Sequence, residues 1–237
     1  MPRDFLPPLR FQWLSRYYDP LMDRLFRDRR RKARFVAALG VGRGTRLLDV
    51  GCGTARLAAA LAADCRQPRL VGIDRDLESV LIAAARLRRL SLNGGLVVGD
   101  AASLPFASGS FDCVTSTLVF HHLSTPKKRI ALRETLRALR ARGRFLLLDF
   151  ARPSGTLRRL AFLGVRLFDG WRKTAANASG EVPVLMIKEG FRGIREEYLD
   201  DTPFGTLRCY SATSQESGPS PAVGPYEGSQ NVSVTPK

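Results

Sequence analysis

The sequence predicts an α/β fold in which a doubly wound, mainly parallel sheet carries helices on both faces. Five apolar runs alternate along the chain with segments of helical periodicity. These runs are continuous rather than two-periodic, which is typical of strands buried on both faces. With 237 residues and 44% hydrophobic content, the chain is long enough for one large core and short for two domains.

Residues 1–40 are expected to form an N-terminal lid and helical segment. Asp19 is a suitable helix N-cap, Pro20 takes the first helical position and Gly40 ends the helix. The stretch before this helix is rich in aromatic and apolar side chains: Phe5, Leu6, Leu9, Phe11, Trp13, Leu14, Tyr17 and Tyr18. Such a stretch suits a lid over an apolar substrate, a cover for the sheet, or contact with a membrane surface.

The next region, residues 41–211, is expected to be one domain built from alternating strands and helices. Its first five strands are predicted at 45–50, 69–74, 95–100, 111–117 and 144–150. Helices are predicted between them at 55–65, 77–91 with Asp76 as N-cap, and 126–143 with an end near Gly143.

The last part of this domain is predicted to add helical segments around 156–168 and 183–189. Strand-like runs at 192–200 and 202–212 have only a short link between them, which favours an antiparallel pair at the sheet edge. Residues 212–237 are rich in Ser, Gly and Pro and poor in large apolar residues, so they are expected to form a disordered tail.

The composition bounds the partners and the location. A net charge of +16 suggests an anionic partner such as nucleic acid or an acidic membrane, but 32 of the 38 basic residues are Arg scattered along the chain. The start of the chain does not resemble a signal peptide and there is no apolar run of 18 residues, so we expect a cytoplasmic protein. The four cysteines are scattered, which favours reduced thiols and predicts no metal site.

Polar and glycine residues follow four neighbouring predicted strands at the point where each strand ends. The first strand ends in Asp49 and the Gly51-Cys52-Gly53 turn, the second in Asp74, the third in Asp100 and the fourth in Thr117. Ligands of open α/β sheets bind outside the carboxyl ends of the strands. Single acids of this kind are often helix caps, but their shared position predicts that they surround one ligand.

The motifs exclude two common nucleotide sites. A P-loop needs G-x-x-x-x-G-K-[ST], which is absent, and a dinucleotide turn needs a third glycine where this chain has Arg56. Asp49 would repel a pyrophosphate but suits a cationic ligand. An adenosine with a zwitterionic, sulfonium-containing tail fits these acids.

Several stretches closely resemble the class I S-adenosylmethionine-dependent methyltransferases, especially the branch of ubiquinone and menaquinone C-methyltransferases. They are LLDVGCGTA, VGID, GDAASLPFASGSFDCVTSTLVFHHL and LRETLRALRARGRFLLLDF. The resemblance is specific over about residues 15–150 and loose to about 211. It implies a Rossmann-like sheet of seven strands in the order 3-2-1-4-5-7-6 with the seventh strand antiparallel. It also implies S-adenosyl-L-methionine as the cofactor.

The resemblance carries roles to matching positions. Asp49, Gly51 and Gly53 would surround the methionine part, Asp74 would hold the ribose hydroxyls, and Asp100 with Ala101 would contact the adenine amino group. The full set of expected cofactor-binding residues is Tyr18, Asp49, Gly51, Cys52, Gly53, Asp74, Arg75, Asp100, Ala101, Thr117 and Leu118. Tyr18 lies where related enzymes place an aromatic lid residue. Ala55 departs from the family pattern, in which many members have a third glycine.

His121 and His122 follow the fourth strand and are the candidate general bases, because His accepts a proton near neutral pH. A structural role for both, in packing and in capping a turn, is the alternative. The chain lacks the [NDS]-P-P-[YF] and Pro-Cys motifs of DNA methyltransferases. The sequence therefore predicts methyl transfer to a small, apolar or lipid-like acceptor such as a quinone. An RNA methyltransferase and a cofactor-binding protein without turnover are the alternatives.

Overall fold

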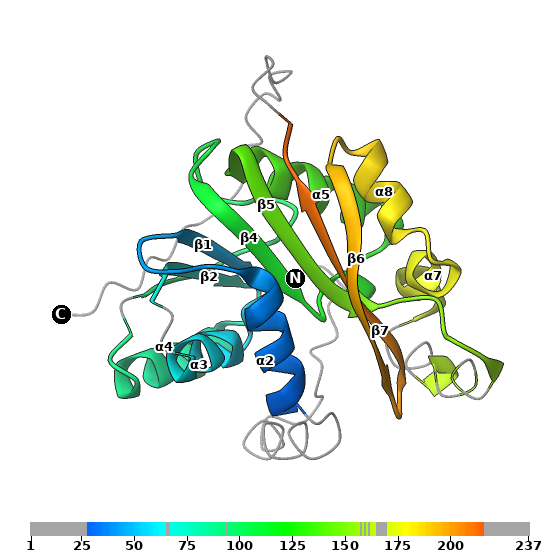
Figure 1. Cartoon of the computed structure of the whole chain (residues 1–237), viewed down its shortest axis with the longest axis horizontal. Coiled ribbons are helices and arrows are strands. Elements are labelled where there is room, and N and C mark those ends of the chain that lie inside the picture. Colours follow the sequence, from blue (N-terminus) through cyan, green and yellow to red (C-terminus); the bar gives the residue numbers. More distant parts are fainter. Residues whose placement is uncertain are drawn as a thin grey trace.

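The structure is a computed structural model, and it describes residues 28–64, 67–92, 94–156, 158, 160, 162–164 and 170–215. Seven strands form one sheet in the order β3-β2-β1-β4-β5-β7-β6 (Figure 1). The strands are β1 (Arg46–Val50), β2 (Arg69–Asp74), β3 (Gly94–Val98), β4 (Phe111–Thr117), β5 (Leu139–Phe150), β6 (Arg192–Thr202) and β7 (Gly205–Thr213). This order confirms the predicted Rossmann-like fold class.

The first five strands are parallel, and β7 runs antiparallel to both β5 and β6. The pairing of β6 with β7 at the edge confirms the predicted antiparallel pair. In the centre of the sheet, Val50 pairs with Ile73 on one side and with Ser116 on the other. The carboxyl ends of β1, β2 and β4 are therefore level, and the residues that follow them share one edge.

The helices cover both faces of the sheet, so the domain has three layers (Figure 1). One core cluster packs α2, α3 and α4 against Leu47, Leu146 and Leu148, and the other packs α5, α7 and α8 against Leu48 and Leu147. The alternate residues of β1 and β5 thus enter opposite layers, as the continuous apolar runs predicted. The helices are α2 (Asp28–Leu39), α3 (Arg56–Ala63), α4 (Leu77–Arg89), the 3₁₀ turn η2 (Phe120–His122), α5 (Thr125–Ala138), α7 (Trp171–Ser179) and α8 (Val182–Lys188).

Two of the predicted helix caps, Asp76 and Gly40, are confirmed. Asp76 accepts a hydrogen bond from the backbone N–H of Ser79, 3.1 Å away, at the start of α4. Gly40 follows α2 with a φ of 62°, the left-handed conformation that commonly ends a helix. The predicted start of this helix at Asp19, and the aromatic stretch before it, lie outside the described residues.

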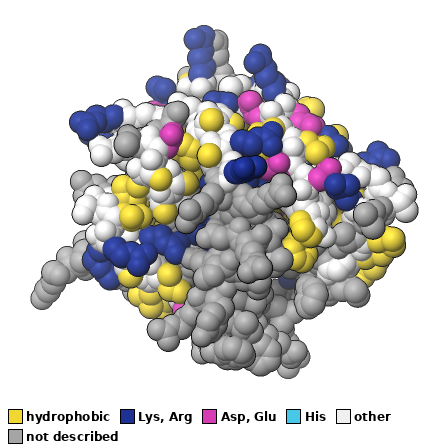
Figure 2. Space-filling view, turned by 60° about the horizontal axis from the view of Figure 1, so that its bottom comes forward, with side chains coloured by type: hydrophobic (Ala, Val, Ile, Leu, Met, Phe, Trp, Pro, Cys, Tyr) yellow, Lys and Arg dark blue, Asp and Glu magenta, His cyan; other side chains and the backbone are white. Residues whose placement is uncertain are grey.

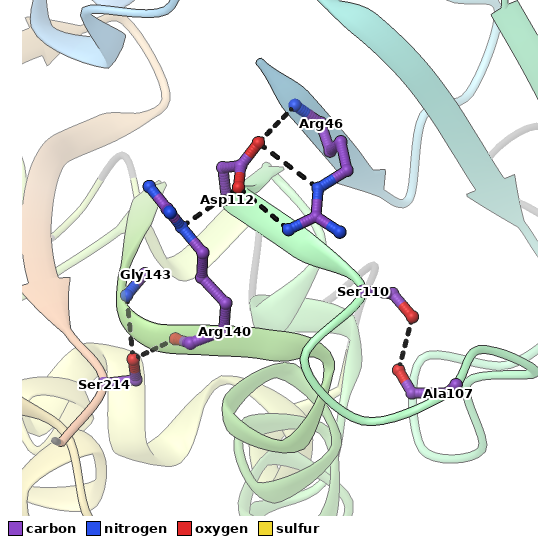
Figure 3. Close-up of polar contacts among 7 residues, drawn as sticks. All are labelled: Arg46, Ala107, Ser110, Asp112, Arg140, Gly143 and Ser214. Carbon is purple, nitrogen blue, oxygen red and sulfur yellow. Dashed lines mark hydrogen bonds and ion pairs between the residues drawn. The ribbon is translucent and has the colours of Figure 1, made fainter. Parts of the chain in front are cut away.

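The prediction of helix from 126 to 143 is wrong at its end, because α5 stops at Ala138 and β5 begins at Leu139. Leu139 pairs with Phe111 of β4, and Arg140 Nε lies 3.0 Å from Asp112 Oδ1. Ser214, directly after β7, accepts through Oγ from the N–H of Gly143 and donates to the carbonyl of Arg140, so it holds the first part of β5 in place (Figure 3). These long-range contacts outweigh the helix propensity of Leu, Arg and Ala.

One further helix and one further boundary differ from the predictions. Helix α7, over 171–179, was not expected. Strand β7 continues to Thr213, past the expected boundary at residue 211, and Ser214 is buried. The rest of the predicted tail, residues 216–237, lies outside the described part of the chain. None of the helices within the described ranges has the length and hydropathy needed to cross a membrane.

Candidate functional site

Asp49 lies on β1 between Gly72 of β2 and Thr115 of β4, and only 2% of it is exposed. Among the described residues, its Oδ1 atom has no hydrogen-bond partner although it is buried. Burial, and after it the negative charge of Asp74, raise the pKa of Asp49 to about 7, while Lys32 on α2 opposes the shift. A buried oxygen of this kind is costly unless a ligand pairs with it.

The turn after β1 has glycine at positions 51 and 53, and the reason for the missing side chain differs between the two. Gly51 has a φ of 75°, and a Cβ atom there would lie 2.1 Å from Cγ2 of Val119. Gly53 has a φ of 50°, and within the described structure a Cβ atom there would meet nothing within 4 Å. Gly51 therefore permits close packing against the segment after β4, whereas Gly53 opens space above the turn.

Asp74 ends β2 and binds the glycine turn directly. Its Oδ2 accepts from the N–H of Gly53 at 2.8 Å, and its Oδ1 accepts from the N–H of Asp76 at 3.0 Å. Burial raises the pKa of Asp74, while these amides oppose the shift. The structure thus brings Asp49, Asp74 and the turn together at one edge of the sheet.

Asp100 lies two residues beyond the end of β3 at Val98, so the predicted strand 95–100 ends earlier than expected. Its Oδ1 accepts from the N–H of Ala102 at 2.9 Å, and its Oδ2 lies 3.7 Å from Nε of Arg75. Asp100 and Ala101 are both half-buried. These two residues and Arg75 form the rim of the site on the β3 side.

Two residues of helix α5, Glu134 and Arg137, bind the backbone of the segment after Asp100. The sequence did not identify them. Glu134 Oε2 accepts from the N–H of Leu104 at 2.9 Å, and Arg137 donates to the carbonyls of Leu104 and Phe106. The two side chains also form an ion pair at 2.8 Å. Their spacing of three residues was visible in the sequence, but their partners in a distant loop were not.

The remaining predicted cofactor-binding residues differ in whether they lie at this edge of the sheet. Leu118 follows β4 with a φ of 58°, an unfavourable conformation for a residue with a side chain, and its N–H donates to the carbonyl of Leu148. Thr117 and Leu118 are half-buried at the same edge as the glycine turn. Cys52 contributes its backbone, since its side chain is buried beside Gly72. Tyr18 lies outside the described residues.

The two histidines occupy different environments in η2, directly after this edge. His121 is 4% exposed, and its Nδ1 lies 2.7 Å from Oδ1 of Asp149. His122 is exposed, and its ring centroid lies 3.9 Å from that of His121. The pair at the carboxyl edge therefore consists of one buried and one accessible imidazole.

Asp149 and Lys128, which the sequence analysis missed, complete the buried side of this pair. Asp149 ends β5 in the same way that Asp49 and Asp74 end theirs, so the same strand-end rule could have identified it. Burial alone would raise the pKa of Asp149, but the charge and hydrogen bond of His121, the Phe150 amide and Lys128 together lower it. Lys128 looks in the sequence like one of a run of solvated cations, yet it is fully buried.

Figure 2 views the molecule from the lower side of Figure 1, the side where β5 ends. On the part of this face that belongs to described residues, Lys and Arg side chains lie in several separate groups among hydrophobic ones. Among the described residues between β5 and β6, five large hydrophobic side chains are exposed, namely Leu160, Leu163, Trp171, Val184 and Ile187. Charge on this face is therefore interspersed with apolar surface.

S-adenosylmethionine fits the residues of the site by their chemistry. The buried, unpartnered oxygen of Asp49 suits the ammonium group of a methionine tail, and the open space at Gly53 leaves room for the chain of that tail. Asp74 is a half-buried acceptor suited to a ribose diol, and Asp100 is an acceptor suited to an exocyclic amine.

Comparisons with known proteins agree with this site. A family described as a methyltransferase domain matches residues 47–143. A demethylmenaquinone methyltransferase of Beutenbergia cavernae is 35% identical over 148 residues, which are 60% of this chain and 57% of the relative. The ubiquinone/menaquinone biosynthesis C-methyltransferase UbiE of Pseudomonas putida is 35% identical over 139 residues, 54% of this chain and 51% of the relative. The chain thus matches little more than half the length of these relatives.

Solved structures share the fold at low sequence identity. A methyltransferase of Aquifex aeolicus that depends on S-adenosylmethionine superposes with a TM-score of 0.59 at 19% identity, covering 88% of this chain and 98% of that one. Phosphoethanolamine N-methyltransferase 2 of Haemonchus contortus, in complex with S-adenosylhomocysteine, gives a TM-score of 0.66 at 17% identity and covers 79% of this chain and 53% of that one. Residues 47–143, which include the glycine turn, Asp49, Asp74 and Asp100, therefore match a methyltransferase domain, and a little more than half of the chain is similar to quinone C-methyltransferases.

Proposed function

We propose that this chain transfers the methyl group of S-adenosylmethionine to a small, apolar, quinone-like acceptor. The observation that carries the proposal is the buried Asp49 oxygen without a partner among the described residues, next to the open glycine turn. The similarity to demethylmenaquinone and ubiquinone/menaquinone C-methyltransferases supports the acceptor class. The exposed Leu160 and Trp171 beyond β5 agree with an apolar acceptor.

The residues of the chain would divide the work of binding. Asp49 and the turn at Gly51 and Gly53 would hold the methionine part, Asp74 the ribose, and Asp100 with Ala101 the adenine. Thr117 and Leu118 would line the site beside the methionine part. Bound S-adenosylmethionine supplies an activated methyl group on a sulfonium, with a neutral leaving group. The protein then contributes mainly alignment and exclusion of water.

A hydroxylated acceptor such as a quinol must lose a proton when the methyl group is added. His122, which is exposed at the carboxyl edge, would accept that proton, since imidazole is the side chain suited to this at neutral pH. A cytoplasmic location, with contact to a membrane surface through the N-terminal aromatic stretch, agrees with a lipid-like acceptor and remains a prediction from the sequence.

The test is methylation of a short-chain demethylmenaquinol by the full chain with methyl-labelled S-adenosylmethionine, followed by mass identification of the product. The wild type and a Glu196→Gln control, which alters an exposed carboxylate on β6, are expected to form the methylated quinol. Asp74→Ala is expected to weaken cofactor binding by about 1–3 kcal/mol, because it leaves polar groups without partners.

Two results would contradict the proposal. Binding of S-adenosylhomocysteine without methylation of any quinol or lipid-extract component would favour a cofactor-binding protein without turnover. Methylation of added RNA in place of the quinol would favour the RNA methyltransferase alternative.

A further inference from the structure

The two histidines after β4 differ in burial, and this difference assigns them different tasks. His121 is buried between His122 and Phe150, with ring centroids 3.9 Å and 5.0 Å away. Its ring meets Phe150 edge to face at 89°. His122 is the exposed member of the pair. An acceptor arriving at the carboxyl edge can therefore reach His122, whereas His121 lies behind it.

Asp149 determines the proton position on His121. The Nδ1 to Oδ1 distance of 2.7 Å is that of a strong hydrogen bond, and the lowered pKa of Asp149 means that this carboxylate is ionised. An ionised carboxylate can only accept, so the proton of this bond belongs to Nδ1 of His121. Asp149 Oδ2 also accepts from the backbone N–H of His121 at 3.1 Å, so both the ring and the backbone of His121 are held.

Lys128 on α5 lies near His121 and Asp149 and connects them to α7. Its ammonium donates to the carbonyls of Leu123 and Lys173, which joins the loop after η2 to α7. Lys128 is fully buried, and its charge interacts favourably with that of Asp149. The Asp149 carboxylate therefore has a cation on one side and the His121 ring on the other, and η2 is packed between β5 and α7.

We propose that His121 and Asp149 form a buried positioning pair that holds the ring of His122 at the carboxyl edge, where His122 accepts the proton of the methyl acceptor. The inference rests on the proposed function for the last step only. His121 and Asp149 act through His122 and do not themselves meet the acceptor. A carboxylate that fixes the tautomer and orientation of a histidine is also found in other enzymes.

The geometry can be tested without any acceptor, because the chain has only two histidines and nitrogen NMR of the imidazoles gives two sets of signals. In the full wild-type chain, His121 is expected to show one slowly exchanging Nδ1–H, since that proton is buried and bound to a carboxylate. In Asp149→Asn, the amide oxygen that remains is a neutral and weaker acceptor, so this proton is expected to exchange faster and the signals of His122 to shift, while in Glu196→Gln both stay unchanged. An unchanged exchange rate of the Nδ1–H in Asp149→Asn, or unmoved His122 signals, overturns the pairing.

Kinetics with the quinol assay test whether the pair acts through His122. His122→Asn, His121→Asn and Asp149→Asn are each expected to lower kcat about tenfold or more, with the affinity for S-adenosylhomocysteine unchanged. Adding Asp149→Asn to His122→Asn is expected to cause no further loss, because the residue through which Asp149 acts is already absent. A full additional loss in the double variant overturns the positioning role.

Two further controls keep the outcomes distinct. Where Asp149→Asn does not fold, as judged by its melting temperature, His121→Asn serves instead, since an asparagine amide can still donate to Asp149. In that variant the His122 signals are expected to shift and kcat to fall. Absence of methyl transfer in the wild type, with the slowly exchanging Nδ1–H present, contradicts the proposed function but leaves the His121 and Asp149 pairing intact.

Discussion

Cofactor binding is expected to release a proton from Asp49. Burial and the nearby charge of Asp74 raise the pKa of Asp49 to about 7 in the protein without ligand. A cationic ammonium group placed against its unpartnered oxygen favours the ionised carboxylate and returns the pKa to its ordinary range, about 4. The ligand-free protein therefore holds a proton near neutral pH that the complex does not hold.

The size of the effect follows from the two pKa values. At pH 6.5 a carboxyl of pKa 7 is about three-quarters protonated, so binding is expected to release roughly 0.75 proton, whereas at pH 8 it releases about 0.1. Because the ligand-free state binds more protons, affinity rises with pH. The dissociation constant for S-adenosylhomocysteine is expected to be about 30-fold larger at pH 5.5 than at pH 8.

Isothermal titration calorimetry in buffers of different ionisation enthalpy measures this proton directly. Asp49→Asn removes the titrating group, so in that variant the heat is expected to be independent of the buffer at pH 6.5. His122→Asn is the matched control, because it removes an imidazole at the same edge of the sheet but leaves Asp49 in place, so it should keep the release. Equal heats in all buffers at pH 6.5 for the wild type, or release that survives in Asp49→Asn, would refute this account of Asp49.

Further predictions concern the glycine turn, the adenine side, the buried lysine and the charge. Gly51→Ala is expected to lower the free energy of unfolding by about 2–4 kcal/mol, from its positive φ and its clash with Val119. Chemical denaturation measures this, and adding Val119→Ala should recover the part due to the clash. Glu134 accepts from the N–H of Leu104 beside the predicted adenine contact. Glu134→Ala is therefore expected to reduce the preference for S-adenosylhomocysteine over its inosine analogue about tenfold, as measured by calorimetry. Glu134→Gln is expected to have a smaller effect. Lys128→Met is expected to lower the free energy of unfolding by about 3 kcal/mol, because the charge of Asp149 loses its buried cation. Denaturant titrations measure this, and unchanged stability would contradict the assigned contacts. Filter binding to mixed RNA is expected to show no steep salt dependence, and such a dependence would favour an RNA substrate.

Much of the site was predictable because it follows a local rule. Asp49 and Asp74 end buried strands of a parallel sheet, so they had to meet at one edge once the strands were recognised. The glycines at 51 and 53 stood out because glycine is unfavourable in element interiors, and the structure gives each a positive φ. Asp149 lies at the end of β5 and obeys the same strand-end rule.

Other residues could not be assigned from the sequence, because contacts with distant parts of the chain decide them. Residues 139–143 have the composition of a helix, but pairing of Leu139 with Phe111 and the bonds from Ser214 make them part of β5. Lys128 sits in a basic run, yet the carbonyls of Leu123 and Lys173 enclose its ammonium. No local pattern distinguishes a buried lysine from a solvated one.

The sequence alone determined the α/β class and predicted the edge of the sheet and the acids that form the candidate site, because hydrophobic periodicity and strand ends are local properties of the chain. The strand order, implied at first only by family resemblance, is confirmed by the pairing of the strands. Only the tertiary structure separated the buried His121 from the exposed His122 and joined His121 to Asp149, 28 residues further along the chain. That distinction depends on how η2 packs between β5 and α7, which two adjacent, identical residues cannot reveal.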